Sequence, residues 1–331
     1  MKIKSVLGTV VLFFLLAAVS FASIFFGAEK ISFADLAAGG RDGIKFIILF
    51  EIRLPRIILC AVCGALLGGS GAVFQGFFRN PLADSGILGI SSGATLGSIV
   101  CGFFPIASLS LKFLSPMPFF SFLGGLLAGL LVFFFSLIFR NGSSVTTLLS
   151  GTVTGTFFSA LSSLLIIFHE KNFHSIFVWT MGSFNAKGWD EVNFFLIPSL
   201  VSIAMLLLCA PSLDILGGGE KTAQSLGLDF RRAKIFILLS GTLATSCAVC
   251  SGGIISFVGL IAPHLMRSIF GPNHRTLIPQ SMAAGAILLI VSDIVARTAV
   301  APSEIPIGII TSLVGVPFFI AVLKRDVYVH G

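Results

Sequence analysis

Ten long apolar stretches run through the chain and constrain its fold more than any other feature. A helix needs about twenty apolar residues to cross the hydrocarbon core of a bilayer, because that core is about 30 Å thick. The stretches lie near residues 6–26, 54–77, 86–104, 119–139, 146–168, 192–211, 235–252, 254–270, 277–296 and 306–323. We therefore expect an all-α, polytopic membrane protein with about ten transmembrane helices, organised as a single transmembrane domain over residues 1–331.

The composition agrees with a membrane protein. Only 11% of the residues are charged and 56% are hydrophobic, whereas soluble domains carry about 25% charged residues. The net charge of +7 reports on the placement of loops and does not indicate a nucleic-acid partner. Lys2 and Lys4 precede the first apolar stretch as in a signal peptide, but Val6 to Phe26 is long enough to span and is expected to be an uncleaved first helix.

The basic residues predict the orientation. An even number of spans puts both termini on one side. With the termini in the cytoplasm, the inner segments carry twelve Lys and Arg against five acidic residues, and the outer segments carry nine against eight. The excess inside predicts cytoplasmic termini. Arg53, Arg56 and Arg297 lie at outer helix ends against this trend, which indicates either contact with lipid phosphates or docking of an acidic partner.

A polar segment from Asp214 to Lys234 separates two apolar stretches. Gly217 to Gly219 is expected to end one helix. Glu220 to Gly227 favours a short helix, which Gly227 ends. On this segment alone, a solvated cytoplasmic loop and a docking element for a partner are equally good interpretations.

Small and hydroxyl residues recur within the spans at helical spacing. Glycines four residues apart predict close packing of helices within one chain, with dimerisation as the alternative. The hydroxyl residues predict either hydrogen bonds between helices or the weakly polar wall of a pathway. The glycine pairs are Gly64 and Gly68, Gly93 and Gly97, and Gly125 and Gly129; the hydroxyl series are Thr147, Ser150, Thr154 and Ser162, and Thr311 with Ser312. Phe173 to Phe184 is apolar but too short to span, and predicts a half-helix.

Two features that resemble chemical sites have simpler interpretations. Gly219-Glu220-Lys221-Thr222 lacks the glycine that precedes the lysine of a phosphate-binding loop, so the chain is not expected to hydrolyse ATP. Asp293 lies four residues before Arg297, which favours an ion pair on one helix face over a proton relay.

Cysteines form two CxxC pairs, Cys60 with Cys63 and Cys247 with Cys250. Both pairs lie in apolar helical segments without a His or acidic residue on the same face. This favours packing over metal binding or redox chemistry. We expect neither a metal nor a cofactor.

Several motifs together resemble the permease subunits of ABC importers for iron–siderophore, haem and cobalamin. They are Arg53-Leu-Pro-Arg56, Gly69 to Gly89, Ala223 to Gly227, Phe257 to His264, Ser292 to Arg297, and Glu304-Ile-Pro-Ile-Gly308 with Pro317-Phe-Phe. The resemblance covers essentially the whole chain, and ten spans is also that family's number. It implies a permease of the inner (cytoplasmic) membrane, itself no enzyme, that moves a metal chelate inward. Iron–siderophore is the first expectation for the cargo, with haem or cobalamin as alternatives.

The resemblance also implies partners and residue roles. The partners are two cytoplasmic ATP-binding subunits, a second permease copy or a paralogue, and a periplasmic or lipid-anchored substrate-binding protein. Membrane lipid surrounds the permease. The implied roles are docking of the binding protein for Arg53, Arg56 and Arg297; coupling to the ATPases for Glu220, Ala223, Leu226 and Gly227; and gates or pathway for Asn80, Leu82, Ser144, Val145, Ser150, Thr154 and Thr311. Val145 stands where the family more often has a small polar residue. An ion-coupled transporter that uses Asp293 and a scaffold or channel subunit without a transport cycle are the alternatives from other classes.

Overall fold

The structure, a computed structural model, describes residues 2–27, 29, 43–103, 116–138, 144–168 and 173–330, and these residues form helices and no strand. Each apolar stretch coincides with a helix. The helices are α1 (Lys2–Phe25), α4 (Leu54–Phe78), α5 (Ile90–Phe103), α6 (Pro116–Ile138), α7 (Ser144–Ile167), α9 (Trp189–Leu208), α12 (Phe230–Gly252), α13 (Val258–Phe270), α14 (His274–Thr298) and α15 (Ile307–His330). Within the described part of the chain, seven helical segments could cross a membrane by length and composition, and three more apolar helices, α5, α13 and α15 to Val322, are shorter.

Shorter elements connect these helices. They are α3 (Ile44–Ile47), a π-helical turn (Ile48–Arg53), a 3₁₀ turn (Ser85–Leu88), α8 (Phe173–Thr180), α10 (Ala210–Leu216) and α11 (Glu220–Ser225). The half-helix expected after residue 172 is α8. The sequence between Glu29 and Ile52 also predicts a small surface helix, but residues 30–42 of that segment lie outside the described residues. The described part of that segment, α3 and the π-helical turn, leads directly into α4.

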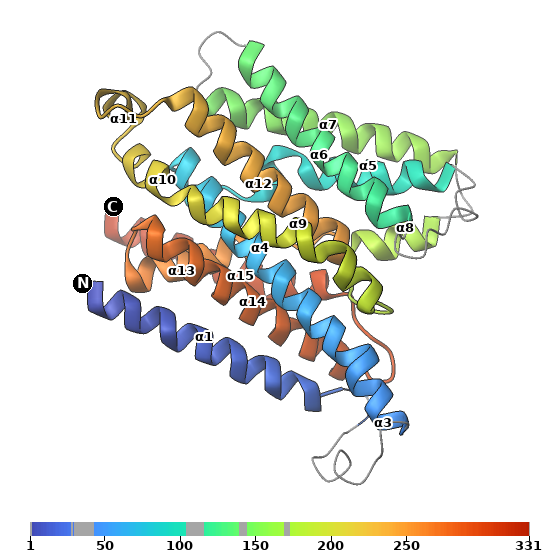
Figure 1. The fold of residues 1–331 in the computed structure, drawn as a ribbon. Helices are drawn as coiled ribbons and strands as arrows, with labels where there is room; N and C mark the ends of the chain where they lie inside the picture. The colour runs from blue at the N-terminus through green and yellow to red at the C-terminus, as the bar shows by residue number, and fades with distance from the viewer. Residues whose placement is uncertain are drawn as a thin grey trace.

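The two termini lie at the same end of the helix bundle (Figure 1). The start of α1 and the end of α15 lie at the end that also carries α10 and α11, which we call the terminal end. The elements α3 and α8 lie at the other end, which we call the opposite end. An even number of crossings, as the apolar pattern predicts, produces this arrangement.

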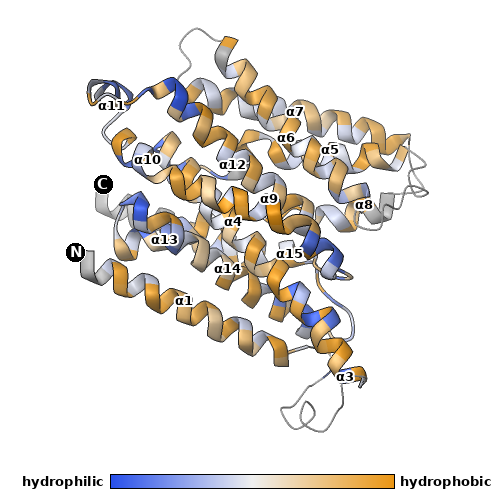
Figure 2. Ribbon diagram, viewed as in Figure 1, coloured by the Kyte–Doolittle hydropathy of each residue, from blue (hydrophilic) through white to orange (hydrophobic). Residues whose placement is uncertain are grey.

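Three helices form the interior of the bundle. In an 18-residue apolar window of the segment that includes α4, and likewise of α12, 78% of the residues are buried; in such a window of α14 the share is 61%, and in that of α1 it is only 6%. Hydrophilic residues gather near the two ends, around α11 and the start of α12 and around the starts of α4 and α9 (Figure 2). Hence α1 is an edge helix whose apolar surface suits lipid, and α4, α12 and α14 carry the core.

Glycines allow the central helices to approach closely, as their spacing predicts. A Cβ on Gly64 would lie 2.4 Å from the carbonyl oxygen of Gly285 on α14, and one on Gly68 would lie 2.2 Å from that of Ser281. A Cβ on Gly129 would lie 2.2 Å from the Thr242 side chain on α12. These glycines pack within one chain, so packing and not dimerisation explains their spacing.

Candidate functional site

The polar segment at the terminal end folds as two short helices with a glycine turn between them. Helix α10 ends at Leu216, and Gly219 has a φ of +101°, a conformation that L side chains rarely adopt. Helix α11 then runs from Glu220 to Ser225, and Gly227 with a φ of +85° ends the segment. The breaks expected from these glycines are therefore confirmed.

The expected coupling residues occupy different faces of this segment. The Ala223 side chain is fully buried, whereas Leu226 is 68% exposed and nothing lies within 4 Å of a Cβ built on Gly227. Gln224 on the same helix is exposed. The helix α11 lies among the hydrophilic residues at the terminal end, so Leu226 and Gly227 are accessible from outside the bundle (Figure 2).

The structure brings one coupling residue and one gate residue together. Oε1 of Glu220 accepts a hydrogen bond from Oγ of Ser144 at 2.7 Å and one from the backbone N–H of Ser144 at 3.3 Å. Ser144 is buried, and the adjacent Val145 is 66% exposed. The first turn of α7 therefore contacts the polar segment from Asp214 to Lys234 directly.

The other expected gate residues form a turn after α4. Arg79 has a φ of +49°, a left-handed conformation that ends α4. Oδ1 of Asn80 accepts the backbone N–H of Leu82 at 2.9 Å, and the Leu82 side chain is 42% exposed. This turn is polar, exposed and held by local hydrogen bonds.

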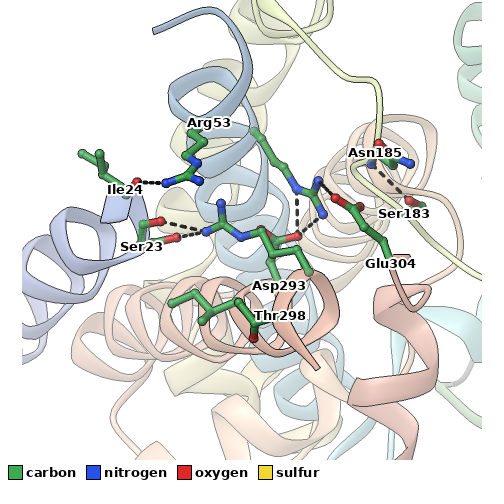
Figure 3. A network of polar contacts seen from close by, with 11 residues as sticks. Ser23, Ile24, Arg53, Ser183, Asn185, Asp293, Thr298 and Glu304 are labelled. Carbon is green, nitrogen blue, oxygen red and sulfur yellow. Dashed lines mark hydrogen bonds and ion pairs between the residues drawn. The ribbon is translucent and has the colours of Figure 1, made fainter. Parts of the chain in front are cut away.

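At the opposite end, charged residues from distant parts of the chain form a buried cluster (Figure 3). Nε and Nη2 of Arg56 both donate to Oδ1 of Asp293, at 3.0 and 2.9 Å, and Nη1 of Arg56 donates to Oε1 of Glu304 at 2.9 Å. Nε of Arg297 lies 3.3 Å from Oδ2 of Asp293, which confirms the ion pair expected from their spacing. Asp293 is only 1% exposed, so both guanidinium groups neutralise a buried carboxylate.

Two of the arginines also hold the end of α1. Nη2 of Arg297 donates to the carbonyl of Ser23 at 2.9 Å, and Nη1 of Arg53 donates to the carbonyl of Ile24 at 2.7 Å. Arg53 also donates to the carbonyl of Glu29. These contacts satisfy carbonyl groups at the end of α1.

Contacts within the arginine cluster give a further explanation for the positive charge at the outer helix ends. Arg53, Arg56 and Arg297 are only 5%, 6% and 5% exposed. Arg56 and Arg297 pair with acidic residues of this chain, and Arg53 donates to backbone carbonyls. Contact with lipid phosphate or with an acidic partner is therefore not needed to explain where these arginines lie. In this conformation the three arginines cannot contact an outside protein directly. They can affect it only by positioning surface groups such as Glu304, whose side chain is 28% exposed.

The hydroxyl series of α7 faces the interior of the bundle. Thr147 and Ser136 of α6 share a hydrogen bond at 2.8 Å, and Thr154 donates to the carbonyl of Ser150 at 2.7 Å. Ser150, Thr154 and Thr311 are 6%, 3% and 1% exposed. The interior position matches the interpretation of this series as helix contacts, and the pathway role of these three residues stays a prediction.

The opposite face of α7 is exposed and carries both apolar and hydroxyl side chains, which the sequence pattern did not predict. That face carries Val145, Leu149, Val153 and Phe157, together with the exposed hydroxyls of Thr152, Thr156, Ser159 and Ser163. A bilayer does not require hydroxyls on a lipid-facing helix. In the sequence, these exposed hydroxyls stand between or beside the buried hydroxyls Thr147, Ser150, Thr154 and Ser162, so α7 carries hydroxyl groups on more than one face.

A cleft of about 590 Å³ opens between the end of α8, the segment after α12 and the first half of α15. Its hydroxyl groups come from Thr180, Ser256 and Ser312, and no residue that lines it is charged. The backbone N–H groups of Ile307 and Gly308 donate to the carbonyls of Gly182 and Met181, at 2.9 and 3.1 Å, which fastens α15 to the end of α8. The cleft therefore suits a ligand held by shape and hydroxyl contacts.

Both CxxC pairs lie in the core. Cys60, Cys63, Cys247 and Cys250 are each at most 1% exposed, and Sγ of Cys63 donates to the carbonyl of Ala248 at 3.4 Å. Among the described residues, no group of three or more His, Cys, Asp or Glu side chains could hold a metal ion. These contacts are those of small packing residues.

Comparisons with known proteins agree with this geometry. Residues 15–325 match the FecCD transport family. The chain is 39% identical over 280 residues to the cobalamin import system permease protein BtuC of Halobacterium salinarum, covering 84% of this chain and 73% of that protein. It is 35% identical over 334 residues to the iron(3+)-hydroxamate import system permease protein FhuG of Bacillus subtilis, covering 97% and 98% of the two chains. A solved chain described as an inward-facing metal-chelate type ABC transporter is 35% identical, with a TM-score of 0.84 and coverage of 96% of this chain and 98% of that chain.

Proposed function

The chain belongs to the FecCD transport family, and from this membership we propose that it is the membrane permease subunit of an ATP-driven importer that carries an iron–siderophore chelate inward. The observation that carries the proposal is the match over residues 15–325, which includes both the polar segment from Asp214 to Lys234 and the helices around the cleft. Permeases of this kind contribute the passage, and ATP hydrolysis belongs to a partner subunit.

An iron–siderophore is the cargo that we propose. A relative that matches 98% of its own length to this chain is named for iron(3+)-hydroxamate import. The uncharged cleft with three hydroxyl side chains is compatible with a bulky chelate whose metal is already enclosed by its own ligands. Haem and cobalamin are the alternative cargoes of the same machine, and another relative is named for cobalamin import.

We propose that two ATP-binding subunits dock at the terminal end, which then lies in the cytoplasm. We call the polar segment from Asp214 to Lys234 the docking segment; it contains Glu220, Ala223, Leu226 and Gly227. Its exposed leucine and the surrounding polar groups support this assignment. The second permease, a copy or a paralogue, would lie against α7 and α15. The location would be the inner (cytoplasmic) membrane.

A substrate-binding protein would dock at the opposite end. Because Arg53, Arg56 and Arg297 are buried, we propose that they act on docking by fixing the outer surface. Arg56 bonds Glu304 in the segment between α14 and α15, and the backbone N–H of Ile305 donates to the carbonyl of Ala296 at 3.0 Å. This segment is therefore held in one conformation for a partner.

An ion-coupled transporter is the weaker candidate. It requires Asp293 to release and bind an ion during transport. Both oxygens of Asp293 face arginine side chains, at 2.9 Å from Nη2 of Arg56 and 3.3 Å from Nε of Arg297. A carboxylate held by two buried guanidinium groups is better suited to a structural role.

Cysteine-accessibility labelling tests the orientation on which the proposal depends. Gln224 of α11 and Asn185 of the loop before α9 are both exposed and lie at the two ends of the bundle. We expect a membrane-impermeant maleimide to label Q224C only from the cytoplasmic side and the matched variant N185C only from outside. Labelling of Q224C only from outside would contradict the proposed docking site for the ATPases.

A further inference from the structure

Two polar links connect the docking segment to the first turn of α7. The first is the Glu220 carboxylate, which accepts both the Oγ–H and the N–H of Ser144, at 2.7 and 3.3 Å. Glu220 is half-buried and Ser144 is 8% exposed, so water competes little for the shorter bond. A carboxylate at the first residues of a long helix also interacts favourably with the helix dipole.

The second link starts at Lys234, the last residue of the docking segment. Lys234, in the first turns of α12, donates to Oγ of Ser136 on α6, which shares a hydrogen bond of 2.8 Å with Oγ1 of Thr147. Lys234 is 4% exposed, and Ser136 and Thr147 are fully buried.

Ser144 and Thr147, which receive these links, are three residues apart on α7 and therefore share a helix face. Both ends of the segment from Glu220 to Lys234 are thus linked to the same turn of α7. Glu220 contacts that turn directly, and Lys234 reaches it through Ser136 of α6. A rigid helix that is held at its first turn transmits a displacement along its length, because its backbone hydrogen bonds resist bending.

The preceding helix, α10, is fastened to a different part of the bundle. Oδ1 of Asp214 accepts the backbone N–H of His274 at 2.8 Å and lies 2.8 Å from its Nδ1, which ties α10 to the start of α14. Gly217 to Gly219 lies between this anchor and Glu220. Glycines tolerate large changes in φ and ψ, so α11 can move relative to α10 at this point.

We propose that Glu220 is a positioning residue that ties α11 to α7, so that displacement of α11 by an ATPase moves the gate at Ser144 and Val145 while α10 stays anchored to α14. This inference rests on the proposed docking of the ATPase at α11. It assigns Glu220 a role toward its own chain, which is separate from any contact with the ATPase.

The test reports on the gate and does not depend on the cargo. In the permease co-purified with its ATPase subunits, V145C is labelled with a membrane-impermeant maleimide, with and without a non-hydrolysable ATP analogue. We expect the nucleotide to change the labelling rate in the parent. In E220A that change should fall about tenfold, the factor that corresponds to loss of one hydrogen bond to a charged group. E220Q should retain most of the change, because the amide oxygen still accepts the Ser144 hydroxyl.

Ser268→Ala on α13 is the control and should respond as the parent does, because the exposed Ser268 hydroxyl donates to the carbonyl of Leu265 on its own helix. A full nucleotide response in E220A, an E220Q response as small as that of E220A, or no response in the parent would overturn the inference. Co-purification of the ATPase subunits reports separately on docking, so its absence in the parent would count against the proposed function and not against the link.

Discussion

Asp293 is the residue on which the opposite end of the bundle depends most. Its carboxylate is almost completely buried and faces Arg56 of α4 and Arg297 of its own helix. The same two arginines reach Glu304 and Ser23, so α1, α4, α14 and the segment before α15 meet at one acidic group. Breaking a buried ion pair by removing one partner is costly because the remaining charge is left without compensation.

We predict that Asp293→Asn destabilises the protein by about 3–5 kcal/mol, since it leaves two buried arginines sharing the one remaining acid. Thermal unfolding in detergent measures this as a large fall in Tm. The matched control is Asp229→Asn, because Asp229 caps α12 and pairs with an 88% exposed Arg232, and asparagine caps a helix equally well. Equal Tm values for the two variants would show that the cluster contributes little to stability.

Only part of this residue-scale picture could be predicted from the sequence. The Asp293–Arg297 pair was predictable because it is local, four residues along one helix. The Arg56–Asp293 contact joins residues 237 apart and depends on how α4 packs against α14, which no local pattern encodes. For the same reason the outer arginines looked like surplus charge.

Among the helices, α4 and α14 pack closely against each other at their glycines. Gly64 and Gly285 face each other, and a Cβ on either would lie within 2.4 Å of the other's carbonyl oxygen. The spacing of the glycines predicted this kind of contact. The orientation of α7 was less predictable, because buried and exposed hydroxyls alternate on it and a period of 3.6 residues does not tell which face turns inward.

Gly64→Ala is predicted to cost about 1–3 kcal/mol, because the added methyl group forces two packed backbones apart. The same substitution at Gly86 should change the unfolding free energy little, since the nearest atom to its Cβ, in the Asp84 side chain, lies 3.9 Å away. Thermal unfolding of the two variants in the same detergent makes the comparison. A smaller loss at Gly64 than at Gly86 would contradict the close packing of α4 on α14.

At the scale of the whole molecule, the exposed faces of α7 and α15 indicate where a second permease would lie. On α7, hydroxyl groups such as Thr152 and Thr156 accompany exposed Val153. On α15, Leu313 is 67% exposed and lines the cleft together with Ser312. A second permease against these faces would enclose the cleft and give the cargo a passage between the two subunits.

We predict that V153C and L313C, in a background without the native cysteines, form disulfide crosslinks between two permease subunits under mild oxidation. Val153 is 65% exposed, whereas the adjacent Thr154 is 3% exposed, so T154C is the matched control that should not crosslink. Gel electrophoresis without reductant detects the product. If neither V153C nor L313C crosslinks, the second permease lies elsewhere and the assigned passage is wrong.

We propose that this chain forms the passage of an importer driven by ATP hydrolysis on a partner. The most direct test reconstitutes the permease with its ATPase subunits in proteoliposomes that enclose ATP, adds the binding protein loaded with a radiolabelled ferric hydroxamate outside, and measures uptake. We predict uptake that requires enclosed ATP and is insensitive to a protonophore. Uptake that proceeds without ATP and stops when the proton gradient is collapsed would contradict the account and favour an ion-coupled transporter.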